Sequence, residues 1–403
     1  MLSALELDRK VAQARERLLN VVHKTPLDYS NTFSSLLGGR VYLKLENLQK
    51  TGSFKVRGAY FKISALGPEV KQVVTASAGN HAQGVAYASK LLGKRAVVFM
   101  PTTAALSKIR AVEAYGAQVE LTGQLFDDAY EAALAYVREK GGAFIHPFDD
   151  YDIIAGQATV GLEILEEAVP ELVVVPIGGG GLISGIAYAL KRRLGSNVRI
   201  IGVQSEAAPT FYEALKRGTT QRITPKPTIA DGIVTKQVGE LTLRMVSQYV
   251  DDIVLVSDDE IARAIFLLLE RCKVLAEGAG AASLAAMLSH KVEVQGKSAV
   301  AVISGGNLDL TLLQKLLLRE MMAEGRIARI RGEVLDRPGE LSRVLALLAS
   351  FRCNVLDIWH DRVESALRPG WAVVTILFEQ PAPDTARRLI ARLAEEGYRF
   401  DLD

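Results

Sequence analysis

The chain has 403 residues, of which 49% are hydrophobic, 23% are charged and 6% are aromatic. This composition is typical of a folded globular protein, and it excludes disordered, collagen-like and low-complexity classes. The formal net charge is +2 and no block of like charges occurs, so we expect neither a nucleic-acid partner nor a membrane partner. At roughly 150 residues per domain, the length predicts two to three domains.

The amino terminus and the cysteines indicate a cytoplasmic protein. The first ten residues carry acidic side chains where a signal peptide needs a basic region and then an apolar run. No run of about 18 uncharged apolar residues occurs. The two cysteines, Cys272 and Cys353, cannot form a disulfide framework and lack the spacing of a zinc site. We therefore expect a cytoplasmic location and no metal.

From Val41 to about Leu318, short β-branched runs alternate with amphipathic segments. Strands are expected at Val41–Leu45, Val73–Ala76, Ala96–Phe99, Gln118–Leu121, Leu172–Ile177, Arg199–Val203, Ile253–Val256 and Ala299–Ile303. Helices between them are expected at His81–Leu92, Lys108–Tyr115 and Leu182–Arg193. The alternation predicts an α/β fold with mostly parallel sheets, arranged as two lobes with a cleft.

The tail after about Gly325 has a different pattern. No lysine occurs after Lys315, and arginine supplies every basic side chain from there on. Strands and helices are expected in the order Ile327–Leu335 (strand), Pro338–Phe351 (helix), Asn354–Val363 (strand), Trp371–Glu379 (strand), Pro383–Glu396 (helix) and Tyr398–Leu402 (strand). This βαββαβ order predicts a ferredoxin-like unit.

A run of four glycines, Gly178 to Gly181, follows the strand expected at Leu172–Ile177 and precedes Leu182. Backbone N–H groups at the start of a helix, with no Cβ in the way, can bind phosphate. A dinucleotide-binding loop would need a glycine where Ser184 stands, and a P-loop would need Gly-Lys-Ser/Thr. We therefore favour a cradle for a phosphate compound smaller than a dinucleotide; the alternative is a simple tight turn.

A second segment reads Ser53-Phe54-Lys55-Val56-Arg57. Ser53 is expected to be the N-cap of a helix, with Lys55 in the first turn and Arg57 nearby. The helix dipole and a neighbouring cation both disfavour a protonated lysine, which is the condition for Schiff-base chemistry. By spacing alone, however, Lys55 could be a solvated surface lysine and Phe54 could belong to the core.

Two further turns of small residues follow predicted strands. Ser77-Ala78-Gly79-Asn80-His81 could hold a carboxylate on its N–H groups, and the Asn80 amide could bond a phenolic oxygen. A structural role is expected for His81. Ser304-Gly305-Gly306-Asn307 follows the strand Ala299–Ile303. No Ser-His-Asp order stands out.

In this order, the four segments resemble those of the pyridoxal-phosphate-dependent serine/threonine dehydratases of fold type II. The resemblance is specifically to the threonine dehydratases (threonine ammonia-lyases) with one carboxy-terminal ACT domain, and it covers essentially the whole chain. Asp336-Arg337-Pro338-Gly339-Glu340-Leu341 is similar to the first strand-to-helix loop of an ACT domain. The resemblance implies a two-lobed fold like that of tryptophan synthase β, with a large pyridoxal-phosphate-binding lobe (1–46 and 149–320), a small lobe (47–148) and an ACT regulatory domain (326–403).

The resemblance also implies a role for each site residue. Lys55 would bind pyridoxal phosphate covalently and act as the catalytic base, with Phe54 stacked on the ring. Asn80 would contact the phenolic oxygen of the cofactor, and Ser304 would contact its pyridine nitrogen. The phosphate would bind Gly178, Gly179, Gly180, Gly181 and Leu182, and the substrate carboxylate would bind Ser77, Ala78, Gly79, Asn80 and His81. Glu277 and Asp231 match family positions near the cleft.

The implied reaction converts L-threonine to 2-oxobutanoate and ammonia, and L-serine to pyruvate. Isoleucine, valine or leucine would act as an effector, bound near Asp336, Pro338, Gly339, Glu340 and Leu341, with Pro338 beginning a helix. A homodimer or homotetramer that acts in amino-acid metabolism is also implied, and both isoleucine biosynthesis and threonine breakdown stay open as its cellular role.

Departures from related enzymes leave some alternatives open. Serine racemases have a serine where this chain has Ala78, so reprotonation from that face of the cofactor is expected to lack a donor. Eukaryotic racemases bind a divalent metal through carboxylates where this chain has Gln204 and Thr210, so no metal is expected there. The alternatives are a serine racemase or serine-preferring dehydratase, an amino-acid sensor with an inactive catalytic half, and a tail that serves only for dimerisation.

Overall fold

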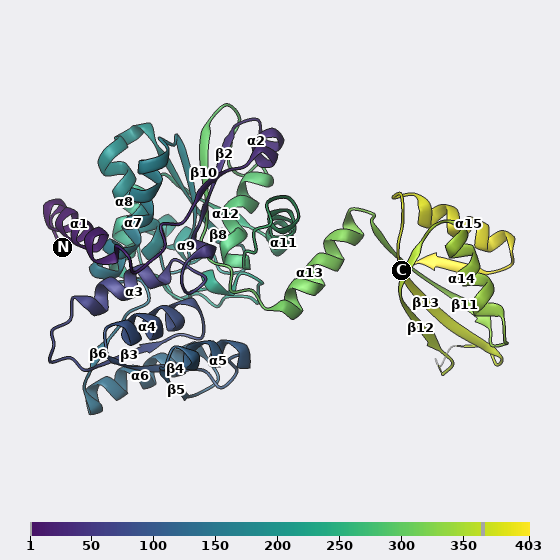
Figure 1. Cartoon of the computed structure of the whole chain (residues 1–403), viewed down its shortest axis with the longest axis horizontal. Helices are drawn as coiled ribbons and strands as arrows, with labels where there is room; N and C mark the ends of the chain where they lie inside the picture. The colour runs from purple at the N-terminus through teal and green to yellow at the C-terminus, as the bar shows by residue number, and fades with distance from the viewer. Residues whose placement is uncertain (1, 364–366) are drawn as a thin grey trace. The chain divides into compact units, whose positions relative to one another are not determined.

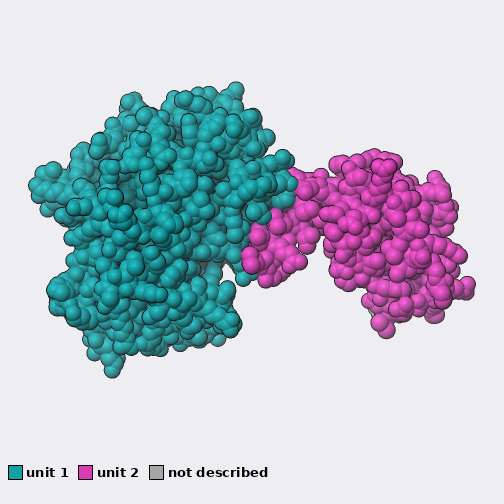
Figure 2. Space-filling view, viewed as in Figure 1, with its two compact units in different colours: residues 1–309 teal, residues 310–403 magenta. Residues whose placement is uncertain are grey.

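The computed structural model describes residues 2–363 and 367–403. The chain divides into two compact units, residues 1–309 and 310–403, which are coloured separately in Figure 2. Each unit is described here by itself. None of the described helices has the length and apolar character that crossing a membrane requires.

The first unit contains a six-stranded sheet with the strand order β1-β2-β10-β7-β8-β9. Its strands are parallel, except that β1 pairs antiparallel with β2 at one edge. Every residue of β10 and β7 is buried, as expected for central parallel strands covered on both faces. The strands are β1 (Leu27–Tyr29), β2 (Arg40–Leu45), β7 (Leu172–Pro176), β8 (Arg199–Ser205), β9 (Asp252–Val256) and β10 (Ser298–Ile303).

A second sheet of the same unit is fully parallel and has the order β5-β4-β3-β6. Different helices cover its two faces. On one face α4 (Asn80–Leu91) and α5 (Leu106–Ala114) share an apolar cluster with the sheet, and on the other face α6 (Phe126–Lys140) shares a second apolar cluster with it. The strands are β3 (Gln72–Ala76), β4 (Arg95–Met100), β5 (Gln118–Leu121) and β6 (Ala143–Phe144).

Helices surround both sheets of the first unit (Figure 1). The α-helices are α1 (Ala4–Leu18), α2 (Asn31–Leu37), α3 (Lys55–Ser64), α4 (Asn80–Leu91), α5 (Leu106–Ala114), α6 (Phe126–Lys140), α7 (Tyr151–Glu167), α8 (Gly181–Leu194), α9 (Thr210–Arg217), α10 (Glu240–Tyr249), α11 (Asp258–Leu267) and α12 (Gly278–Leu288). Short helical turns are η1 (Glu46–Leu48), η2 (Gly195–Asn197), η3 (Asp231–Ile233) and the π-helical η4 (Leu268–Cys272).

The second unit begins with α13 (Leu310–Ala323) and continues as an antiparallel sheet with the order β12-β13-β11-β14. Two helices, α14 and α15, share one apolar core with this sheet. The βαββαβ order and this strand arrangement fit a ferredoxin-like unit. The remaining elements are β11 (Ile327–Leu335), α14 (Glu340–Ser350), β12 (Asn354–Asp361), β13 (Trp371–Glu379), α15 (Thr385–Glu395) and β14 (Arg399–Leu402).

The elements predicted from the sequence are present, with small shifts at their ends. Two short strands, β1 and β6, were not predicted, because three and two residues carry too little alternation to be recognised. The expectation that Pro338 begins a helix is wrong. Gly339 has a φ of 96° and is the N-cap, so α14 begins at Glu340. The expected lobe boundaries stay a prediction.

Candidate active site

A cavity of about 750 Å³ lies in the first unit, at loops that follow strands of both sheets. Because the carboxyl ends of parallel strands share one edge of a sheet, the loops after β3, β7 and β10 converge there. The cavity is lined by every cofactor and substrate residue predicted from the sequence, namely Phe54, Lys55, Ser77, Ala78, Gly79, Asn80, His81, Gly178, Gly179, Gly180, Gly181, Leu182 and Ser304. The five candidate effector residues belong to the second unit.

Lys55 is the first residue of α3, but the helix does not begin as predicted. Phe54 is the N-cap residue and makes no capping bond with its side chain. Ser53 is paired through its backbone with Gly305, and its hydroxyl has no partner among the described residues. The prediction of a Ser53 cap is wrong, because this pairing keeps Ser53 outside the helix.

The Lys55 side chain is half-buried in the cavity wall. Its Nζ donates a hydrogen bond to the carbonyl oxygen of Pro147 at 2.9 Å. Burial lowers the pKa of Lys55 to about 8, and the carboxylate of Glu277 opposes this effect. The lower pKa of Lys55 therefore comes from desolvation. Arg57, which was expected to contribute, is not among its causes. A lysine of this kind is neutral often enough near neutral pH to act as a nucleophile or base.

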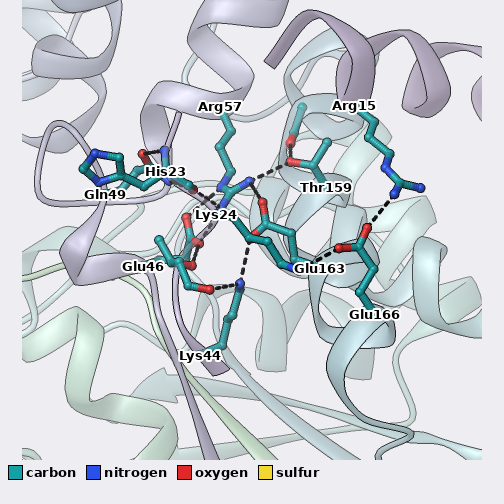
Figure 3. Close-up of polar contacts among 12 residues, drawn as sticks. Arg15, His23, Lys24, Lys44, Glu46, Gln49, Arg57, Thr159, Glu163 and Glu166 are labelled. Carbon is teal, nitrogen blue, oxygen red and sulfur yellow. Dashed lines mark hydrogen bonds and ion pairs between the residues drawn. The ribbon is translucent and has the colours of Figure 1, made fainter. Parts of the chain in front are cut away.

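The Arg57 side chain instead belongs to a buried ionic cluster with Lys44, Glu46 and Glu163 (Figure 3). Arg57 donates from Nε and Nη2 to the two Glu46 oxygens, both at 2.8 Å, and from Nη1 to Glu163 at 2.6 Å. Lys44 donates to the other Glu163 oxygen at 2.6 Å. Removing one member of such a cluster leaves a buried charge unpaired, which costs about 3–5 kcal/mol. The cluster joins the Lys55 helix to β2, η1 and α7.

The glycine run follows β7 and leads into α8. A Cβ on Gly179 would lie 2.0 Å from the Phe148 ring, and a Cβ on Gly180 would lie 2.5 Å from the Phe211 ring. Gly180 also has a φ of 85°, which side-chain-bearing residues rarely adopt. Backbone N–H groups in the first turn of a helix have no intrahelical partner. This segment therefore presents bare N–H groups to the cavity and excludes larger residues.

The Asn80 turn begins α4 and meets two distant segments. Asn80 Nδ2 donates to Glu277 Oε1 at 2.5 Å, and Asn307 Nδ2 donates to Asn80 Oδ1 at 2.7 Å. Burial and the neighbouring Asp231 raise the pKa of Glu277 to about 7. His81 Nε2 is bonded to the Ile145 carbonyl at 3.1 Å, and burial lowers its pKa to about 3, so its imidazole is neutral.

The loop after β6 forms one wall of the cavity and was not predicted from the sequence. His146 Nδ1 accepts hydrogen bonds from the N–H groups of Phe148 at 3.2 Å and Asp149 at 2.8 Å. Burial lowers the pKa of His146 to about 4, so this imidazole is also neutral. The loop follows a strand of two residues and carries no recognisable motif, so no local sequence pattern indicated it.

Gln204 and Thr210, where racemases have metal-binding carboxylates, make structural contacts. Gln204 Oε1 accepts hydrogen bonds from the backbone N–H groups of Phe211 at 2.9 Å and Tyr212 at 3.0 Å, at the start of α9. Thr210 donates to the carbonyl of Thr235 at 2.7 Å. Within residues 2–363 and 367–403, no group of three or more His, Cys, Asp or Glu side chains could hold a metal ion.

A family model described as a pyridoxal-phosphate-dependent enzyme matches residues 18–305. The chain belongs to this family. The prediction that the protein is an enzyme dependent on pyridoxal phosphate is confirmed. The matched segment contains every cofactor and substrate residue that was predicted from the sequence and lines the cavity.

Curated relatives match most of the chain. An L-threonine ammonia-lyase of Thermotoga maritima is 46% identical over 391 residues, which is 96% of this chain and 97% of that protein. The catabolic L-threonine dehydratase TdcB of Escherichia coli K12 is 45% identical over 313 residues, which is 76% of this chain and 94% of that protein. Among solved structures, maize serine racemase is 34% identical with a TM-score of 0.73, covering 78% of this chain and 98% of that one.

Proposed function

We propose that this family member is a threonine ammonia-lyase that deaminates L-threonine to 2-oxobutanoate and ammonia. The observation that carries the proposal is the position of Lys55, a half-buried lysine with a lowered pKa, on the same cavity as the glycine run and the Asn80 turn. The names of relatives that are 45–46% identical to this chain support threonine as the substrate.

The cavity fits pyridoxal phosphate on structural grounds. The bare N–H groups of the glycine run suit a phosphate because they lie at the start of α8. A Cβ on Gly179 would collide with Phe148, so a larger residue is excluded there. The Lys55 amine, with its lowered pKa, suits attack on a carbonyl carbon. Ser304 lines the cavity and is 3% exposed, so its hydroxyl is available to form a hydrogen bond with a ring nitrogen.

Each predicted role is retained in the proposal. Lys55 would bind the cofactor, Phe54 would stack on it, Asn80 would donate to its phenolic oxygen and Ser304 would contact its nitrogen. The phosphate would bind the N–H groups of Gly178, Gly179, Gly180, Gly181 and Leu182. The substrate carboxylate would bind the turn of Ser77, Ala78, Gly79, Asn80 and His81, at the positive end of α4.

When bound, pyridoxal phosphate supplies an electron sink for the negative charge that forms at the substrate's α-carbon. Lys55, once the substrate's amino group has displaced it from the cofactor, would be a free neutral amine and would take the α-proton as general base. The N–H groups of the Asn80 turn hold the substrate carboxylate, which orients the α-proton toward Lys55. His81 and His146 are neutral, so they add no cation that would compete for the carboxylate. The α-proton and the β-hydroxyl would thus leave, in sum, as one water molecule. The released enamine would tautomerise to an imine, and water would hydrolyse the imine to ammonia and the 2-oxo acid.

We assign residues 1–46 and 149–320 to the large lobe, 47–148 to the small lobe and 326–403 to an ACT domain. The βαββαβ order supports the last assignment. The E. coli dehydratase matches over only 76% of this chain although 94% of its own length is covered, so the rest of this chain has no counterpart in that match. A branched-chain amino acid acting through this tail, and activity on L-serine, belong to the same proposal, as does a homodimer or homotetramer.

One experiment tests the function directly. An absorbance spectrum of the purified protein reports bound cofactor, and addition of L-threonine or L-serine is followed by a 2-oxo-acid assay. We expect 2-oxobutanoate from threonine and pyruvate from serine. A normal cofactor spectrum without any 2-oxo acid would favour the inactive sensor, and D-serine as the main product would favour the racemase, whose fold is similar.

A further inference from the structure

A chain of hydrogen bonds runs along the cavity wall through Asn307, Asn80 and Glu277, all of which line the cavity. Asn307 Nδ2 donates to Asn80 Oδ1 at 2.7 Å, and Asn80 Nδ2 donates to Glu277 Oε1 at 2.5 Å. The three residues come from separate segments: Asn80 begins α4, Glu277 precedes α12, and Asn307 follows β10. The contacts therefore connect parts of the site that are far apart in the chain.

The bonds at both ends of this chain determine which way the Asn80 amide points. Asn307 Nδ2 also donates to the Thr51 carbonyl at 2.9 Å, so both of its hydrogens are bound to oxygen atoms. The Asn80 atom that faces Asn307 must therefore be the oxygen. An ionised Glu277 can only accept, so the Asn80 atom that faces Glu277 must be the nitrogen. The orientation of an asparagine amide is often ambiguous, but here both neighbours require the same one.

One N–H of Asn80 remains beyond the bond to Glu277, because an amide nitrogen carries two hydrogens. We propose that Glu277 is a positioning residue that, together with Asn307, holds the Asn80 amide so that this N–H donates to an anionic oxygen of the cofactor. The inference rests on the proposed function, because it takes Asn80 as a cofactor contact. If the amide turned over, its carbonyl would face that oxygen and repel it.

The surroundings of Glu277 fit this role. A Cβ on Gly305 would lie 2.3 Å from Glu277 Oε1, so the glycine leaves room for the carboxylate. Asp231 of η3, Lys108 of α5 and Lys55 of α3 are the charged groups that act on it. Burial and Asp231 raise the pKa of Glu277 to about 7, so protonation just below neutral pH removes the charged acceptor and weakens the restraint on Asn80.

The test is a double-mutant cycle on the full-length protein, measuring the dissociation constant of pyridoxal phosphate by equilibrium dialysis. We expect Glu277→Ala to raise this constant about tenfold, as for loss of a charged hydrogen bond. In an Asn80→Ala background, the same change should have less than about a twofold effect, because Glu277 acts through Asn80. An equal effect in both backgrounds would overturn the proposal.

A second variant decides the matter if Glu277→Ala does not fold. Glu277→Gln keeps the shape and an acceptor oxygen but does not titrate. The dissociation constant of the cofactor at pH 6, divided by that at pH 8, should be several-fold smaller in this variant than in the wild type. An unchanged ratio would overturn the proposal. Glu113→Ala, on the exposed face of α5, is the matched control and should behave as wild type.

These measurements use the cofactor without substrate, so they separate the two proposals. Absence of 2-oxobutanoate would contradict the proposed function and leave the Glu277 result standing. An additive cycle with normal threonine turnover would contradict only the inference.

Discussion

Gly156 of α7 lies against Gly58 of α3, so closely that a Cβ on Gly156 would be 2.6 Å from the Gly58 Cα. A Cβ on Gly185 of α8 would meet the Ala158 nitrogen of α7 at the same distance. Three helices therefore pack backbone to backbone through glycines. Because Gly58 lies one turn beyond Lys55, this contact sets the position of the residue proposed to bind the cofactor.

The first prediction tests this packing with Gly156→Ala. Alanine favours a helix by about 0.5–1 kcal/mol over glycine, but the added methyl group must push α3 away from α7. We expect a net loss of about 1–3 kcal/mol in the free energy of unfolding, measured by urea denaturation. Cofactor attachment at Lys55 should fall as well.

Gly161→Ala on the same helix is the control. Its Cβ would lie 3.0 Å from the Ala189 side chain, which is a milder contact. The stability loss should therefore be smaller, and a Gly156 variant no less stable than the Gly161 variant would contradict the packing argument.

The second prediction concerns Lys55. Lys55→Ala should remain folded, bind the cofactor only non-covalently and turn over no threonine, whereas Lys50→Ala at an exposed position should behave as wild type. Borohydride reduction followed by peptide mass mapping identifies the attached lysine. Attachment to any other lysine would show that the assignment is wrong.

The pKa of Lys55 also predicts a pH dependence. Only the neutral amine attacks the cofactor's carbonyl carbon, and burial lowers the pKa of Lys55 to about 8 from its ordinary value of 10.5. The rate at which the cofactor-free protein takes up pyridoxal phosphate should therefore rise with pH and level off above about pH 8. A rise that continues to pH 10 would indicate an ordinary, solvated lysine.

Much of the fold could be predicted from the sequence because its signals are local. The apolar runs of β7 and β10 and the glycines at Gly178 to Gly181 can be recognised without knowing what they contact. The bond between Asn80 and Glu277 joins residues 197 positions apart, and no local pattern indicates it. The same holds for the Pro147 carbonyl that binds Lys55, and for the pairing with Gly305 that removes Ser53 from the helix.

The third prediction separates a lyase from a racemase. Ala78 lines the cavity in the Asn80 turn, and its methyl group cannot donate a proton. Wild type should release 2-oxobutanoate from L-threonine with negligible racemisation, and Ala78→Ser should add measurable D-serine from L-serine. Chiral chromatography of the reaction decides this. D-serine formation by the wild type at a rate comparable to pyruvate formation would contradict the lyase assignment.

The candidate effector loop in the second unit, residues 336–341, makes contacts that an amino-acid effector would have to replace or accommodate. The Asp336 carboxylate accepts hydrogen bonds from Arg362 Nε at 3.0 Å, so an effector's ammonium group would have to replace this guanidinium. Pro338 and Gly339 precede α14, whose first N–H groups have no intrahelical partner. Glu340 accepts from the Tyr398 hydroxyl at 2.8 Å, which joins the start of α14 to the turn before β14.

The fourth prediction is that isoleucine, valine or leucine changes the apparent affinity for threonine through this loop. A coupling free energy of about 1–3 kcal/mol corresponds to a change of roughly 5- to 150-fold, which titration of each amino acid at subsaturating threonine would detect. Asp336→Ala should abolish the response, because it removes the carboxylate that would face the ammonium group.

Asp384→Ala, at the exposed N-cap of α15, is the matched control and should respond as wild type. A response that survives Asp336→Ala would locate the sensor elsewhere. Calorimetry that detects no amino acid bound to the intact protein in the absence of cofactor and substrate would leave the tail a structural role alone.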